Sequence, residues 1–205
     1  MLRKTMNIID NLEAIEESLP AESSHDFSLI QNDENPNEWE NVLKMKQRAF
    51  DMSSKIFAEN DEIILKVWTQ WDDEKSYFRT HKDNKIHRIF GNKNTHFLNT
   101  IVTKHEDVTK YKDNYQYVNI NSFYKIRYGA GNIERLINSI IVRNLPLHWS
   151  KSRPLPFGEL ILYNPQNETY VQLYDFQYIR IQFEDEKLKE DFKAYFKLEQ
   201  IESWE

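Results

Sequence analysis

The stretch ELILYNPQNETYVQLYDFQYIRIQF, residues 159–183, decides the fold. Strand-forming residues fill Glu159–Tyr163 and Glu168–Tyr174, and the residues between them are typical of a turn. A further strand is predicted at residues 178–183, where isoleucine and phenylalanine alternate with polar side chains. The stretch therefore predicts strands that run together near the end of the chain.

One face of the predicted hairpin is aliphatic and the other is rich in tyrosine. We expect the aliphatic face to cover the core, through Leu160, Leu162, Val171 and Leu173. The candidate binding residues lie on the other face or at the end of the hairpin, and they are Tyr163, Tyr170, Tyr174 and Asp175. Exposed tyrosines would form a partner-binding patch, whereas tyrosines covered by a helix would contribute only packing.

Helices are predicted before and after this stretch. The apolar periodicity predicts helices over Ile8–Leu19, over the segment from Asn35 to Phe57, over residues 133–141 and over the chain end from residue 185. In the second helix, Asn35 is the expected N-cap and Pro36 the first-turn residue, and a broad apolar face from Trp39 to Phe57 is expected to pack deeply. In the last, one face carries Leu188, Phe192, Tyr195 and Phe196.

The remaining segments are predicted with different degrees of detail. Residues 20–35 mix proline, serine, asparagine and acids, which is typical of a linker or ordered loop. EIILKVWTQW, residues 62–71, is the first core strand. The runs Tyr115–Ile120 and Phe123–Tyr128 fit a hairpin or a bulged strand, and residues 70–114 show too little pattern for an assignment.

Together these elements indicate the α+β class, with helices packed on a mainly antiparallel sheet. We expect a single globular domain over residues 36–205, preceded by an N-terminal helix and loop over residues 1–35.

The composition of the chain indicates the kind of compartment in which it is expected to fold and function. The chain has 205 residues and no cysteine, which excludes disulfides and thiolate chemistry and favours a reducing compartment such as the cytoplasm. No secretory segment and no apolar run of membrane-spanning length is present in the sequence, so we expect no membrane partner. Large rings are abundant, with 5 Trp, 11 Tyr and 12 Phe.

Charge is distributed unevenly around a net value of −6. Residues 1–40 hold 2 basic and 10 acidic side chains, residues 159–205 hold 5 and 11, and residues 77–112 hold 8 and 3. Acidic ends favour a basic protein partner, and a basic middle with aromatic rings is a pattern that nucleic-acid-binding proteins also use. The overall acidity argues against nucleic acid, and ordinary solvated faces would produce the same pattern.

Catalytic motifs are missing from the sequence. No histidine pair has helical metal-ligand spacing, no nucleophile elbow occurs, and GAGN at residues 129–132 lacks the lysine of a phosphate loop. Gly129 and Gly131 permit a left-handed backbone, and Asn132 is the expected cap of the helix that follows. We predict no catalytic residue, no metal site and no cofactor.

Several stretches resemble the bacterial family DUF3885, a domain of unknown function. The resemblance lies in RAFDMSSKIFAENDEIIL (residues 48–65), in the helix at 133–142 followed by LPLHW, and in ELILYNPQNETYVQLYD (residues 159–175), and it extends over residues 39–205. In the family the hairpin commonly ends in a tyrosine, two aspartates, an arginine and a glycine. Here Tyr174 and Asp175 match, but Phe176, Gln177 and Tyr178 replace the rest, which favours a turn over a retained site. The resemblance implies a compact bacterial domain and no particular activity.

The leading hypothesis is a non-enzymatic protein-interaction domain, with an immunity protein against a co-encoded toxin as its specific form. The alternative is a small hydrolase or nucleic-acid processing enzyme, whose first candidate residues are His81, His87 and the acids near Asp72. A third hypothesis is a subunit whose helix Ile8–Leu19 packs on another copy of the chain; the sequence leaves the oligomeric state open.

Overall fold

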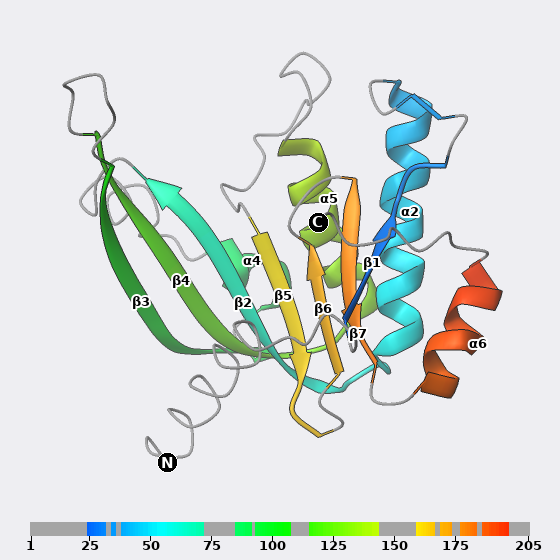
Figure 1. Cartoon of the computed structure of the whole chain (residues 1–205). Helices are drawn as coiled ribbons and strands as arrows, with labels where there is room; N and C mark the ends of the chain where they lie inside the picture. The colour runs from blue at the N-terminus through cyan, green and yellow to red at the C-terminus, as the bar shows by residue number, and fades with distance from the viewer. Residues whose placement is uncertain are drawn as a thin grey trace.

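One antiparallel sheet organises the part of the chain that the computed structural model describes, which is residues 24–31, 34–35, 38–71, 85–91, 93–107, 115–143, 159–166, 169–173, 177–183 and 186–196. Its strands are β1 (Ser24–Ser28), β2 (Glu62–Trp71), β3 (Thr95–Asp107), β4 (Tyr115–Arg127), β5 (Glu159–Asn164), β6 (Thr169–Leu173) and β7 (Tyr178–Gln182). They pair in the order β1-β7-β6-β5-β2-β4-β3, so β1 and β3 are the edges (Figure 1). The helices are α2 (Trp39–Ile56), α4 (Lys85–Phe90), α5 (Ala130–Arg143) and α6 (Glu186–Phe196). The predicted α+β class is confirmed.

The helices pack on one face of the sheet, which we call the helix face (Figure 1). Because successive strand residues point to opposite faces, alternate positions of each strand enter the core between sheet and helices. Fully or almost fully buried members of this core include Met45, Met52, Leu65, Ile133, Leu136, Leu162, Val171, Ile181 and Phe192. Each such side chain contributes about 1.5–3 kcal/mol relative to an exposed one.

The predicted hairpin is confirmed as β5 and β6. The register places Leu160 opposite Leu173 and Leu162 opposite Val171, and all four are buried on the helix face. The strand predicted at 178–183 is also confirmed as β7, with alternating burial. The alternation of residue types predicted these strands correctly because all three place aliphatic residues on the helix face.

Strand β1 corrects the interpretation of residues 20–35 as a linker or loop. Ser24–Ser28 pairs with β7 along its whole length, and Phe27 is fully buried in the main core. The segment SHDFS was missed because only one of its side chains is apolar, as expected for an edge strand whose second face is polar. The helix predicted at Ile8–Leu19 lies outside the described residues.

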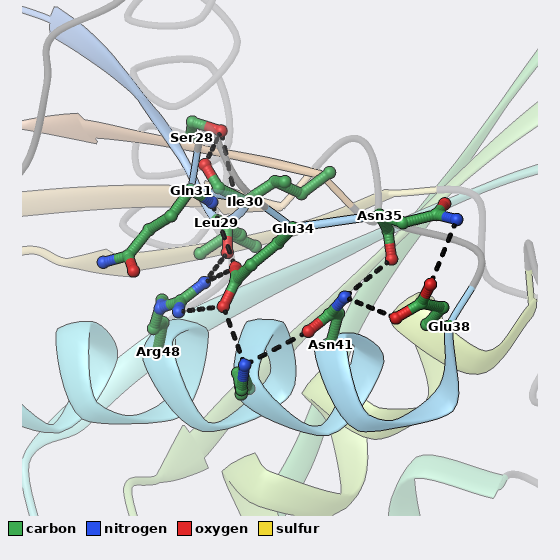
Figure 2. Close-up of polar contacts among 10 residues, drawn as sticks. Ser28, Leu29, Ile30, Gln31, Glu34, Asn35, Glu38, Asn41 and Arg48 are labelled. Carbon is green, nitrogen blue, oxygen red and sulfur yellow. Dashed lines mark hydrogen bonds and ion pairs between the residues drawn. The ribbon is translucent and has the colours of Figure 1, made fainter.

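The backbone after β1 is fixed to α2 by a carboxylate and a guanidinium, as Figure 2 shows. Arg48 donates hydrogen bonds to both carboxylate oxygens of Glu34, at 2.7 Å for Oε1, and donates another to the Leu29 carbonyl at 2.7 Å. Lys44 lies 3.3 Å from the same carboxylate, and the Gln31 amide donates to it. These bonds, that from Arg48 above all, lower the pKa of Glu34 from 4.5 to about 2, although burial opposes them.

Helix α2 begins at Trp39, later than predicted. Glu38 is the N-cap residue and makes no side-chain cap hydrogen bond. The predicted capping role of Asn35 is therefore wrong; instead its backbone carbonyl accepts a hydrogen bond from the Asn41 side chain at 3.1 Å (Figure 2). The buried face of α2 is also narrower than predicted, because Trp39 is 43% exposed and Leu43 is 45% exposed.

Strand β4 runs without interruption from Tyr115 to Arg127, so the two predicted runs belong to one strand and the hairpin alternative is wrong. Ser122 is buried, and its hydroxyl lies 3.2 Å from that of Thr100 on the neighbouring β3. Because its hydroxyl is hydrogen-bonded, Ser122 can be buried in the middle of the strand. The segment left unassigned in the sequence contains α4 and β3.

Helix α5 begins at Ala130, whose preceding residue Gly129 accepts hydrogen bonds from the amides of Asn132 and Ile133. Neither Gly129 nor Gly131 adopts the left-handed backbone that glycine permits, since the positive-φ glycine among the described residues is Gly91. The expected capping role of Asn132 is wrong, because this residue lies inside α5.

Helix α6 packs through Phe192, whose ring contacts Phe27, Phe183 and Phe196. Tyr195 was predicted on the same face but is 66% exposed, with the Lys55 ammonium 4.6 Å from its ring centroid. The Leu188 side chain lies outside what the structure describes.

Candidate functional site

Two of the predicted binding residues, Tyr163 and Tyr170, lie inside the molecule. Tyr170 is fully buried and Tyr163 is 5% exposed, and they form a second apolar cluster with Ile64, Phe123 and Ile161 on the face away from the helices. These two tyrosines therefore contribute packing instead of an exposed partner patch. Tyr174 and Asp175 lie outside the described residues, so their binding role stays a prediction.

A polar row crosses that second face beside the tyrosine cluster. The register aligns Asp26, Arg180, Gln172, Ile161 and Lys66 on consecutive strands from β1 to β2. Side chains in one such row are neighbours across the sheet. Polar residues of β1, β7, β6 and β2 thus form one band, which Ile161 of the tyrosine cluster interrupts at β5.

The acids of this region are engaged by neighbours. Arg180 donates two hydrogen bonds of 2.9 Å to the carboxylate oxygens of Asp26. Gln172 donates to Glu159 and accepts a 2.9 Å hydrogen bond from the Tyr170 hydroxyl. Because each carboxylate already accepts a bond from a fixed partner, this band has the character of a structural network.

The outer edge of β3 is the candidate functional site (Figure 1). β3 extends over 13 residues and pairs with β4 on one side, and no described strand pairs with its other side. Its register shifts between Phe97 and Asn99 and is regular from Asn99 onward. An unpaired edge presents backbone N–H and C=O groups that can pair with another extended chain.

Within β3, residues 99–103, the sequence NTIVT, form what we call the open edge segment. It contains no charged residue and no proline, the devices that commonly protect sheet edges from pairing. Thr100, Ile101, Val102 and Thr103 are β-branched, which favours the extended backbone. Asn99 and Thr103 are exposed, and Phe97, just before the segment, is 44% exposed.

Metal-ligand groups and membrane-spanning helices are both absent from the described part of the chain. No group of three or more histidine, cysteine, aspartate or glutamate side chains could hold a metal ion there. Among the helices of that part, none combines the length and the apolar character needed to span a bilayer. His96 is exposed, whereas His81, the His87 side chain and the acids near Asp72 lie outside the described residues, so the hydrolase alternative stays a prediction.

Comparison with known proteins identifies the family. A family model described as "Domain of unknown function (DUF3885)" matches residues 14–176. The chain belongs to this family. The match begins before the predicted residue 39 and ends before β7, although β7 holds β1 in the sheet. A search of curated proteins and a search of solved structures found no match.

The open edge segment was not found by sequence reasoning. Its uncharged, β-branched run was visible in HFLNTIV, but whether a strand lies at an edge depends on strand order. The strand order in turn depends on pairings between distant segments.

Proposed function

We propose that this member of the DUF3885 family is a non-catalytic protein-interaction domain that binds an extended segment of a partner protein along the open edge segment of β3. The observation that supports this proposal is the uncharged, regular and open edge at residues 99–103. Strand addition of this kind obtains affinity from backbone hydrogen bonds and specificity from alternate side chains.

The neighbouring residues delimit the segment. A register shift between Phe97 and Asn99 disturbs regular pairing before it, and Lys104 introduces a charge after it. Both features discourage strand pairing. A partner strand would therefore pair with residues 99–103.

The side chains of the segment alternate between the two faces of the sheet. Thr103 lies opposite Asn119 and Asn99 opposite Phe123 on the face away from the helices. Thr100 and Val102 lie on the helix face, opposite Ser122 and Ile120. A bound strand would therefore meet polar and aliphatic groups on both faces, because Ile101 lies between Asn99 and Thr103 and Thr100 precedes Val102.

The partner is proposed to be basic and the compartment to be the bacterial cytoplasm. A net charge of −6 accelerates encounter with a cationic protein through long-range attraction. The absence of cysteine suits a reducing compartment. We include the narrower proposal that the partner is a toxin encoded beside this chain, which the chain neutralises.

Lysine substitutions on the edge test the binding mode. Asn99→Lys and Thr103→Lys place charges on exposed positions of β3, where strand addition would be blocked while folding is retained. Ala194→Lys, at an exposed position of α6, is the matched control. Each variant carries a tag in the native host, and partners are identified by mass spectrometry after purification.

A partner that is retained by the parent and the α6 control but lost from both edge variants supports the proposal. A partner retained equally by all proteins would contradict strand addition at β3. If light scattering shows that the parent is a dimer and that the edge lysines make it monomeric, the edge pairs with a second copy, and the partner proposal is wrong.

The toxin proposal has a separate test. The reading frame beside the gene is expressed alone and together with this chain, and growth is measured. Growth arrest relieved by the parent but not by Thr103→Lys would support neutralisation through β3. If the neighbouring reading frame causes no growth arrest, the immunity proposal is wrong, whereas the interaction-domain proposal is unaffected.

A further inference from the structure

A basic pocket lies at the corner of the sheet where β2 and β3 begin and β4 ends. Its volume is about 220 Å³, and its charged or titratable lining residues are Glu62, Lys93, His96, Lys125 and Arg127. Asn94 and Thr95 add polar groups to the lining. On a chain with a net charge of −6, this is a local concentration of positive charge.

Strand register brings the cations of this pocket together. Lys125 lies opposite His96 on β3, and Arg127 lies opposite Glu62 on β2. Lys125 and Arg127 are two positions apart, so their side chains lie on the same face of β4. The pairing of three strands thus places groups from residues 62, 96, 125 and 127 around one depression.

A short turn supplies Lys93. The Asn94 amide and the Thr95 hydroxyl both donate 3.1 Å hydrogen bonds to the carbonyl of Gly91, whose φ is +76°. The Arg127 amide donates to the Asn94 carbonyl at 3.0 Å. The turn is therefore anchored to the end of β4, and Lys93 is held beside the strand cations.

The charges of the pocket do not cancel. Lys125 lies 2.7 Å from Glu62, and its hydrogen bond and charge, with a smaller contribution from Arg127, lower the pKa of that carboxyl. Glu62 is therefore ionised at neutral pH and offsets one cation. The side chains of Lys93 and Arg127 donate no hydrogen bond to a described residue, so two positive charges remain in excess.

We propose that this pocket binds a phosphoryl group. A phosphate monoester carries a charge close to −2 at neutral pH, which matches the excess of two cations, whereas a carboxylate would leave one uncompensated. Arginine offers paired donors to phosphate oxygens, and lysine offers a compact charge. His96 and the polar groups of Asn94 and Thr95 supply further hydrogen-bonding capacity at the same wall.

The pocket lies outside residues 99–103, so its ligand can be tested separately from the partner of β3. Isotope-labelled full-length chain is titrated with inorganic phosphate at neutral pH and low ionic strength, and amide chemical shifts are followed. The expected result is a saturable shift of residues 93–96 and 125–127, weakened by added sodium chloride. Acetate, titrated in parallel, should bind about tenfold more weakly.

Variants of opposite sign make the test specific. Lys93→Gln and Arg127→Gln should each weaken phosphate binding about tenfold, because each loses a charged donor. Glu62→Gln should strengthen it several-fold by removing the competing carboxylate. This gain of affinity cannot result from misfolding. Lys187→Gln, at an exposed position of α6, should leave the affinity unchanged.

Phosphate binding that is unaffected by all of these variants, or acetate binding as tight as phosphate, would overturn the proposal. Absence of any saturable shift in the parent would also overturn it. Titration with glycerol phosphate and with phosphoserine then distinguishes a small phosphorylated metabolite from a modified protein side chain as the source. Tighter binding of either one identifies the source of the phosphoryl group.

Discussion

Removing the Glu34 carboxylate should destabilise the folded state, and the size of this loss of stability should depend on pH. In Glu34→Gln, the partly buried Arg48 loses its charged partner, although it keeps the Leu29 carbonyl as an acceptor. The Glu34 side chain is 5% exposed, so solvent screens this contact less than a surface ion pair.

The pKa of Glu34 sets the size and the pH range of the effect. The pKa falls from 4.5 to about 2 on folding, and one pKa unit corresponds to about 1.4 kcal/mol, which gives roughly 3 kcal/mol as the upper value. Since the folded-state pKa is lowered, the stabilisation is fully present above pH 4.5 and is lost as the pH falls through 2. Because Arg48 can recover hydrogen bonds to water, we expect about 2 kcal/mol at pH 7.

Urea unfolding followed by tryptophan fluorescence measures this difference at pH 7 and again at pH values down to 2. Glu190→Gln is the control, since Glu190 makes an exposed i,i+3 ion pair with Lys193 and should change stability by less than about 0.5 kcal/mol. If Glu34→Gln resembles this control at pH 7, or if its deficit persists unchanged at pH 2, the carboxylate does not fix the segment after β1 to α2.

Three further predictions concern the framework. Phe192→Ala should lower the free energy of unfolding in urea by about 3–5 kcal/mol, because its buried ring contacts three other rings. Tyr195→Ala, at an exposed position, should lower it by less than about 1 kcal/mol. Equal losses would contradict the packing of α6 through Phe192. Gly91→Ala should lower stability by about 1–2 kcal/mol because the φ of Gly91 is +76°. Gly131→Ala should raise stability by about 0.5–1 kcal/mol, because Gly131 is helical and an added Cβ would meet no atom within 4 Å. Both are measured by thermal melting, and effects of the same sign would refute the reasoning. Asp26→Asn should lower the free energy of unfolding by about 1 kcal/mol, as its ion pair is partly exposed, and a loss as large as that predicted for Phe192→Ala would contradict this.

The sequence predicted the elements whose alternation or helical periodicity is uninterrupted. In β5, β6 and β7 every second residue is aliphatic, and in α5 the spacing of Ile133, Leu136 and Ile137 identifies the buried stripe. In β7 and α5 such patterns arise because one face is more deeply buried than the other, whereas β5 and β6 are buried on both faces.

Elements that break the simple pattern were missed or were predicted only in part. β1 was missed because it carries only one apolar side chain. β4 was predicted as two runs because it contains a buried serine, Ser122, which is hydrogen-bonded to Thr100. The tyrosines of the hairpin appeared suited to solvent because alternation cannot show whether the second face is also covered; Tyr163 and Tyr170 proved to belong to a second buried cluster. The proposed edge and the basic pocket both depend on strand order and register, which local sequence does not specify.

The pairing of β1 with β7 has a consequence for biosynthesis. Asp26 and Arg180 are separated by 154 positions along the chain, so the first described strand leaves the ribosome long before its partner exists. At translation speeds of roughly 5–20 residues per second, β7 is synthesised about 8 to 30 seconds after β1. During that interval Phe27 lacks the neighbours that bury it, and a nascent polypeptide in this condition is a natural client for a ribosome-associated chaperone.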